Sequence, residues 1–337
     1  KIKRLSTSRL ENGGFIPCQP SRFILIMVAL IMTKKKPLID PKSLKFLTAV
    51  SSAEYSKPTL KMGALIASVF DASHGVVYVG ERASEFHGSS VNLTRTNLDN
   101  WNIIHPGLEV LEWALDELKK LSPENKELAK IQFNPDHVYE EDGRVRVILP
   151  EEKGCRIELI LREGELVDQL RKEIQLESYD LAIIGGSQNK RHLAHSLIQY
   201  LPSSIFVLQK LNPRKKYKLL LLVDDSAATR KSVEWGALIA EKLGWPVRTL
   251  TVSKTLRFGA GYQGAADKAK AYFDSRGIEV EQFFLTGDPV RTFVEFAGDN
   301  HFVIMGASTL NPIKQLLFGS KPIKTLEQSD VPILIVR

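Results

Sequence analysis

Apolar runs alternate with amphipathic stretches along most of the chain. In its C-terminal part the apolar runs predict strands, and the segments between them predict helices with apolar residues three and four positions apart. The expected strands are Tyr217–Val223, Val247–Val252, Ile278–Leu285, Phe302–Met305 and Ile333–Val336. The expected helices are Ala227–Leu243, Gly264–Ser275, Pro289–Ala297 and Gly319–Gln328. Uninterrupted apolar strands are typical of a parallel sheet covered by helices on both faces.

An internal repeat divides the chain. Met62–Ala67 (MGALIA) recurs 173 residues later as Trp235–Ala240 (WGALIA), and DLAIIGGS at Asp180–Ser187 has its counterpart in HFVIMGAS at His301–Ser308. Each copy follows the βα pattern of an α/β fold. A polar, proline-marked stretch near residues 212–216 separates the copies, as linkers do.

Two domains are therefore expected, one at residues 41–211 (the N-terminal half) and one at residues 216–337 (the C-terminal half). An insertion at residues 122–152 interrupts the first, and its Asp142-Gly143 pair predicts a hairpin. Residues 1–40 are expected to lie outside the fold. They contain the apolar run Phe23–Met32, which is too short to span a bilayer, and we interpret them as a leader or as sequence upstream of the true start.

Composition narrows the classes of partner. The net charge is +7, but the first 36 residues hold eight basic side chains and one acidic one, so the rest of the chain is neutral. A neutral body argues against nucleic-acid binding, and no membrane partner is expected. With only two cysteines, Cys18 and Cys155, and no CxxC pair, a disulfide framework or a cysteine metal site is not indicated. A cytoplasmic location is the natural interpretation.

A candidate ligand site lies where the C-terminal strands end. Asp224 follows the first expected strand of this half and Gly306 follows the fourth. Ligands of open parallel sheets bind beyond the carboxyl ends of the strands, where the strand order reverses. Gly319-Ser320 opens the last expected helix, whose N–H groups and dipole favour an anion, and Lys321 adds a cation. The pattern predicts a polar contact for a base or sugar beside a phosphate cradle.

Two motifs give the C-terminal half its resemblance to the universal stress protein family. They are Val223-Asp224-Asp225-Ser226 after the first strand, and Gly306 with Thr309, nine residues, and then Gly319-Ser320 after the fourth. The resemblance implies two tandem, doubly wound, Rossmann-like domains, each a parallel five-stranded sheet of order 3-2-1-4-5, packed as a pseudo-dimer. It also implies a site for ATP, with or without Mg²⁺.

The same resemblance assigns roles to individual residues. Asp224 and the backbone of Val252 would flank the adenine, Gly306 would lie near the ribose and phosphates, and Gly319 and Ser320 would bind the phosphates. Thr309 departs from the family pattern, which has glycine there. Because a β-branched residue resists positive φ and fills space beside the phosphate, it puts nucleotide binding in doubt.

The N-terminal half resembles the family without its site. Ser51-Ser52 replaces the aspartate, and the segment between Gly185 and Ile205 is seven residues shorter than its counterpart after Gly306. We expect no nucleotide in this half. Its expected role is to pair with the C-terminal half inside one chain, as single-domain relatives pair in dimers. A homodimer and an unidentified protein partner stay open.

Other motifs are weaker. Gly259–Gly264 spells GxGxxG, but it follows the second strand of its repeat at a distance, so we interpret it as a flexible loop. His192 and His195 lack a third metal ligand and are expected at the surface, as is His301, which could alternatively be a cap. Asp224 and Asp225 point apart in an extended strand and do not form a carboxylate pair. Ser226 is expected to cap the following helix.

These observations favour a tandem universal stress protein that binds ATP in its C-terminal half and acts in stress response or signalling. One alternative is a module of the same fold that binds no nucleotide and acts through protein contacts. A third is an enzyme that hydrolyses ATP slowly. No catalytic residue is identified, and no metal ligands are expected.

Overall fold

The structure is a computed structural model of the whole chain. It describes residues 39–40, 43–80, 106–122, 126–133, 139–141, 144–149, 156–185, 196–197, 200–208, 216–307 and 331–337. The apolar run Phe23–Met32, His192, His195 and the expected helix Gly319–Gln328 lie outside these residues. Within them, no helix combines the length and the hydropathy needed to cross a bilayer.

The C-terminal half has the predicted architecture. Its strands are β8 (Lys218–Leu222), β9 (Val247–Ser253), β10 (Val280–Thr286), β11 (His301–Gly306) and β12 (Ile333–Val336). They are all parallel and lie in the order β10-β9-β8-β11-β12. This is the predicted order 3-2-1-4-5. The sequence therefore identified all five strands, with bounds that shift by one or two residues, as element ends commonly do.

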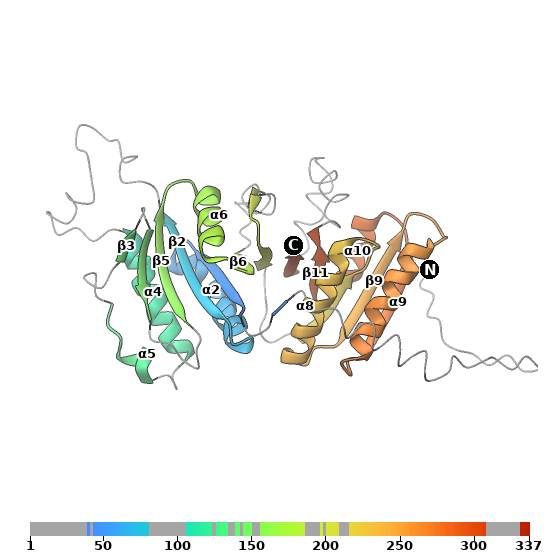
Figure 1. The fold of residues 1–337 in the computed structure, drawn as a ribbon, viewed down its shortest axis with the longest axis horizontal. Helices are drawn as coiled ribbons and strands as arrows, with labels where there is room; N and C mark the ends of the chain where they lie inside the picture. The colour runs from blue at the N-terminus through green and yellow to red at the C-terminus, as the bar shows by residue number, and fades with distance from the viewer. Residues whose placement is uncertain are drawn as a thin grey trace, which may run out of the picture.

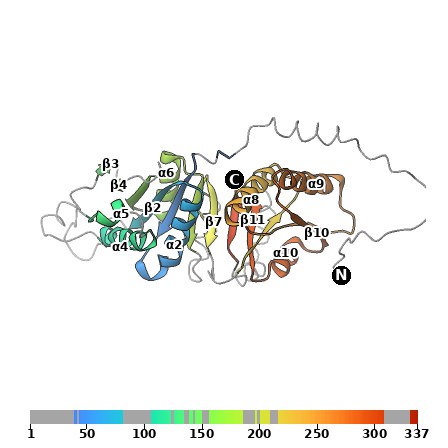
Figure 2. The ribbon, with the colours of Figure 1, turned by 90° about the horizontal axis from the view of Figure 1, so that it is seen from below.

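Helices cover both faces of this part of the sheet. The helices are α8 (Ala227–Leu243), α9 (Ala260–Asp274) and α10 (Pro289–Ala297). Leu219 and Leu221 of β8 share a core with α8 and α9, whereas Leu220 and Leu222 share another with α10. This alternation follows from the two-residue period of a strand and places α8 and α9 opposite α10 (Figure 2).

The N-terminal half repeats the plan and extends it. Its elements are β1 (Lys45–Val50), α2 (Ala53–Val69), β2 (Ser73–Gly80), α4 (Pro106–Leu121), α5 (Lys126–Lys130), β3 (Tyr139–Glu141), β4 (Arg144–Ile148), β5 (Ile157–Glu163), α6 (Leu166–Glu177), β6 (Leu181–Gly185) and β7 (Ser204–Leu208). The parallel strands lie in the order β7-β6-β1-β2-β5. The predicted hairpin strands, β3 and β4, continue the sheet antiparallel beyond β5.

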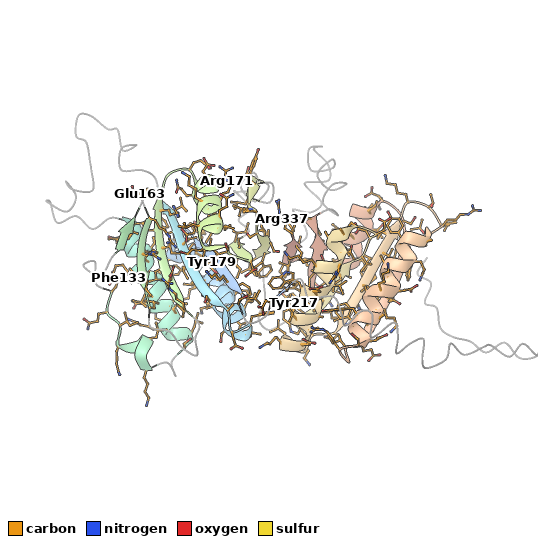
Figure 3. The ribbon with its side chains drawn as sticks, viewed as in Figure 1. Phe133, Glu163, Arg171, Tyr179, Tyr217 and Arg337 are labelled. Carbon is orange, nitrogen blue, oxygen red and sulfur yellow. The ribbon has the colours of Figure 1, made fainter. Side chains whose placement is uncertain are left out.

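The prediction of two separate sheets is wrong. The two halves lie side by side (Figure 1) and share one sheet of twelve strands among the described residues. The last strand of each half makes the connection. These strands, β7 and β12, pair antiparallel, with Ile205 opposite Ile335. Sequence periodicity identifies each strand but does not reveal which edges meet. Figure 3 shows Tyr217 and Arg337 at this junction, where the Arg337 amide donates to Ser204 Oγ at 3.3 Å.

A hydrophobic core crosses the junction on the face covered by α2 and α8. Trp235 of α8 lies 6.1 Å, between ring centroids, from both Phe46 of β1 and Phe70, which follows α2. All three side chains are almost fully buried. The two halves are thus joined by side-chain packing as well as by strand pairing.

Close helix–strand contact explains the glycines of the repeated MGALIA and WGALIA segments. A Cβ at Gly63 would lie 2.1 Å from Thr48 Oγ1, and one at Gly236 would lie 2.7 Å from Leu221 Cδ2. Thr48 and Leu221 belong to the central strands β1 and β8. Each glycine therefore lets its helix lie directly on the central strand of its half.

A buried ionic network attaches α6 to the hairpin insertion. Glu173 of α6 is completely buried and accepts two hydrogen bonds from Arg144 of β4, at 2.9 and 2.6 Å, and one from Arg162 of β5, at 2.6 Å. Arg162 also lies 3.4 Å from Gln169, one turn earlier on α6. Buried charges are tolerated when they are paired in this way, and such networks specify which surfaces meet.

His74 of β2 makes the stability of the fold depend on pH. Its Nε2 lies 2.8 Å from Thr48 Oγ1, and burial lowers its pKa to about 4. Between pH 6.5 and 4 the unfolded chain therefore binds a proton that the folded protein does not, so the free energy of unfolding falls as the pH falls through this range.

We predict that His74→Gln, which can retain the bond to Thr48, reduces this pH dependence. The unfolding free energy of the wild type minus that of the variant should fall by about 2 kcal/mol from pH 7 to pH 5, measured by urea denaturation. Comparing the two proteins cancels the contribution of other titrating groups. Parallel stability curves across this range would contradict the assignment.

Candidate functional site

The candidate site lies at the carboxyl ends of three adjacent strands. β8 is flanked by β9 and β11, so the strand order of the C-terminal half reverses there. The pairs Leu222–Leu250 and Leu221–Ile304 fix the register. When both registers are continued by two residues, Val252 lies level with Asp224, and Gly306 lies level with Val223. The structure thus brings together three predicted site residues across about 10 Å, since neighbouring strands lie ~4.8 Å apart.

Asp224 is held by the turn that leads from β8 into α8. Its Oδ1 accepts hydrogen bonds from the Ser226 amide at 3.1 Å, from Ser226 Oγ at 2.5 Å and from Thr229 Oγ1 at 2.6 Å. Thr229 Oγ1 also lies 3.3 Å from the Asp224 amide and accepts from it. These contacts fix the orientation of a half-buried carboxylate at the mouth of the crevice.

Gly306 permits a close approach of α8 to β11. A Cβ at this position would lie 2.7 Å from Ala228 Cβ and 3.0 Å from the Ala228 carbonyl carbon. The resemblance placed this glycine near the ribose and phosphates of a nucleotide. The structure gives it a packing role, which seats the first turn of α8 at the edge of the crevice.

The Val252 backbone faces the same crevice. The Leu250 carbonyl accepts from the Val223 amide at 3.0 Å, so the backbone groups of Leu250 point toward β8. Backbone groups of alternate residues point the same way along a strand, so the Val252 carbonyl also points to that side. The pairing of β9 with β8 ends at Leu250, whereas its pairing with β10 continues to Ser253. The Val252 carbonyl is therefore placed where a ligand beside Asp224 could reach it.

The predicted capping role of Ser226 is wrong, and the role of Thr229 was not predicted. Ser226 occupies the N-cap position of α8, but its side chain makes no capping bond and donates to Asp224 instead. A signal for Thr229 was present, because Ser56 stands at the equivalent place in the repeat. Ser56 Oγ accepts from the Ser51 amide at 2.7 Å. Ser51 is the counterpart of Asp224 and carries no carboxylate.

The interpretation of the GxGxxG segment as a flexible loop is wrong. Gly259 is the N-cap of α9, and Gly261 and Gly264 lie within that helix. A Cβ at Gly261 would lie 3.0 Å from Asp225 Oδ2. The exposed Asp225 side chain therefore reaches the first turn of α9, while Asp224 is bound to the turn before α8, so the two carboxylates do not form a pair. A carboxylate is favoured at a helix N-terminus.

His301 is buried in β11 and is not a surface residue. Its Nδ1 lies 2.7 Å from the Ala297 carbonyl, and Arg248 Nη1 lies 3.4 Å from its Nε2. Burial lowers the pKa of His301, so the ring is neutral at physiological pH. Within the described ranges no cluster of three or more His, Cys, Asp or Glu side chains is arranged to hold a metal ion.

The remaining predicted site residues cannot be placed. Thr309, Gly319, Ser320 and Lys321 all lie outside the described residues. The structure therefore describes the residues predicted to flank the adenine and not those of the phosphate cradle.

Comparison with known proteins supports the resemblance. The model of the universal stress protein family matches residues 217–337, whereas a search of curated proteins finds no match. A universal stress protein from Archaeoglobus fulgidus DSM 4304 has a similar structure, with a TM-score of 0.57 at 15% identity over 86% of this chain and 96% of its own. A functionally unknown protein from Pseudomonas aeruginosa PAO1 gives a TM-score of 0.50 at 14% identity, covering 88% of this chain and 92% of its own.

A shorter relative was solved with a nucleotide. This universal stress protein from Archaeoglobus fulgidus, in complex with dAMP, covers 49% of this chain and 96% of its own at 12% identity, with a TM-score of 0.30. The two longer matches show that the fold of both halves is shared with known structures. The family match shows that residues 217–337 form a universal stress protein domain.

Proposed function

We propose that the protein binds ATP in the crevice at the ends of β8, β9 and β11, and that it acts as a regulator in stress response. The observation that carries this proposal is the alignment of Asp224, the Val252 carbonyl and Gly306 at the point where the strand order reverses. Open α/β sheets bind their ligands at this point.

The described residues fit the adenine. Its exocyclic amine has two hydrogens to donate, and two acceptors stand level with each other on adjacent strands. One is the Val252 carbonyl. The other is the Asp224 carboxylate, which three hydrogen bonds to Oδ1 hold at the end of β8. Because the turn already fixes the carboxylate, little side-chain entropy would be lost on binding.

The phosphates are assigned to Gly319, Ser320 and Lys321 on the sequence motif. A helix that begins at Gly319-Ser320 would present backbone N–H groups to the anion, and Mg²⁺ would accompany the phosphates. The chemistry proposed is binding, with hydrolysis at most slow.

Helix α8 gives nucleotide binding a route to the rest of the molecule. It begins at the Asp224 turn, and Trp235, further along the same helix, packs against Phe46 and Phe70 of the N-terminal half. A ligand that shifts the first turn of α8 would therefore affect the junction between the halves. We infer that nucleotide occupancy biases a surface read by a partner protein, in a cytoplasmic setting suited to a chain with two cysteines.

The second candidate function is a module that binds no nucleotide. It is favoured by the turn itself, because Asp224 already makes three hydrogen bonds and these could be its whole role. The two functions differ in whether the carboxylate must also accept a hydrogen bond from a ligand.

Asp224→Asn separates the two functions. The asparagine carbonyl can keep the bonds to the turn, while its amide places a donor against the adenine amine. We expect ATP affinity, measured by calorimetry, to fall about 10–100-fold with little change in thermal unfolding. Asp225→Asn, at the exposed neighbour, is the control and should bind as wild type does. Wild-type protein that binds no ATP supports the second function, and equal affinity in Asp224→Asn shows that the pocket lies elsewhere.

Thr309→Gly restores the residue typical of the family. Glycine adopts positive φ without strain and removes the side chain beside the phosphate. We expect ATP affinity to rise about tenfold, with Thr309→Ser, which keeps a side chain that resists positive φ, close to wild type. A variant that binds ATP more weakly than wild type would mean that the threonine contributes contacts and is not an obstacle.

We propose that the N-terminal half takes the place of a second copy. Removing residues 1–215 would expose the edge of β12 and the apolar face around Trp235 and Phe302. An unpaired strand edge is a template for another strand. We therefore expect residues 216–337 to form dimers in sedimentation experiments. A truncated protein that is folded and stays monomeric at every concentration would contradict this role.

A further inference from the structure

An apolar cavity of about 220 Å³ lies at the junction of the two halves, on the face that carries α2 and α8. Thirteen residues line it, and none of them is charged. Six are aromatic: Phe70, Phe206, Tyr217, Trp235, Trp245 and Phe302. The Leu65 side chain, 53% exposed on α2, also lines the cavity. We propose that this cavity binds a small, neutral, apolar aromatic molecule.

The aromatic wall is already assembled. Phe206 of β7 lies 5.0 Å from Phe302 of β11, which lies 5.8 Å from Trp245, which in turn lies 5.9 Å from Tyr217. The distances join ring centroids and fall in the range of favourable aromatic contacts. Phe206 comes from the N-terminal half and the other three from the C-terminal half, so the wall exists only where the halves meet; Tyr217 is labelled in Figure 3.

The size of the cavity selects a small molecule. An apolar cavity of about 150 Å³ holds benzene, so 220 Å³ holds about nine non-hydrogen atoms. A docked helix would instead need a groove that accepts several side chains. The absence of charge among the lining residues also sets this site apart from the nucleotide crevice, because a phosphate would find no cation in the wall.

Trp235 contributes its ring and not its N–H to the cavity. Its side chain is 2% exposed and its Nε1 is fully buried, so a molecule in the cavity does not reach the N–H. The wall therefore requires no hydrogen-bonding group of a ligand and favours one that presents apolar, aromatic surface.

Two probes of similar shape test the proposal on the full chain. Toluene is neutral and apolar, whereas benzoate carries a charge at pH 7.5. We expect saturable, one-to-one binding of toluene by calorimetry, with a dissociation constant of about 0.1–1 mM, and at least tenfold weaker binding of benzoate. Toluene should also shift the ring resonances of Trp235, assigned through Trp235→Phe.

Leucine variants on two helices locate the site. Leu65→Trp fills the cavity from its rim and should weaken toluene binding at least tenfold. Leu176→Trp places the same side chain at an exposed position on α6 that does not line the cavity, and should leave the affinity for toluene unchanged. Thermal unfolding checks each fold, and Met62→Phe replaces Leu65→Trp if that variant is unstable.

Wild-type protein that shows no saturable binding of toluene would overturn the proposal, as it would if the cavity were filled by another part of the chain. Undiminished binding in the cavity-filling variant would place the ligand elsewhere and overturn it too. Equal affinity of wild type for toluene and benzoate would overturn the selection of a neutral ligand.

Discussion

The antiparallel pairing of β7 with β12 is the constraint on which the rest of the structure depends. In a five-stranded sheet of order 3-2-1-4-5 the fifth strand is an edge, with one row of backbone groups unpaired. Here the two edge strands, β7 and β12, satisfy each other's backbone groups, with Leu334 opposite Phe206 at the centre of the pair. The pairing also brings α2 and α8 to the same face, so that their apolar sides enclose one core around Trp235.

Helix α8 connects this junction to the nucleotide crevice, and two glycines determine where it lies. Gly236 allows the middle of the helix to contact β8 at Leu221, and Gly306 allows its first turn to contact β11. Because both approaches leave no room for a Cβ, the helix has little freedom to slide over the sheet. The geometry of the crevice is therefore set by packing that extends to the junction between the halves.

The sequence predicted those features that depend on local pattern. Strand and helix periodicity identified the five strands of the C-terminal half, and the topology that resembles the family placed Asp224, Val252 and Gly306 together. It did not predict the single sheet, because strand edges carry no mark of their partner. It also missed the start of α9 at Ala260, since glycines suggest loops, and the buried Arg144–Glu173 pair, since charged residues suggest solvent.

The comparison of the two strand-to-helix turns bears on the role of Asp224. In both halves a side-chain hydroxyl accepts a hydrogen bond from the backbone N–H five residues earlier. Thr229 Oγ1 accepts from the Asp224 amide, and Ser56 Oγ accepts from the Ser51 amide. The N-terminal turn is formed without a carboxylate, so an aspartate is not needed to build it. A charged, half-buried side chain that the turn does not require calls for another explanation, and a ligand with a hydrogen-bond donor at the carboxyl end of β8 provides one.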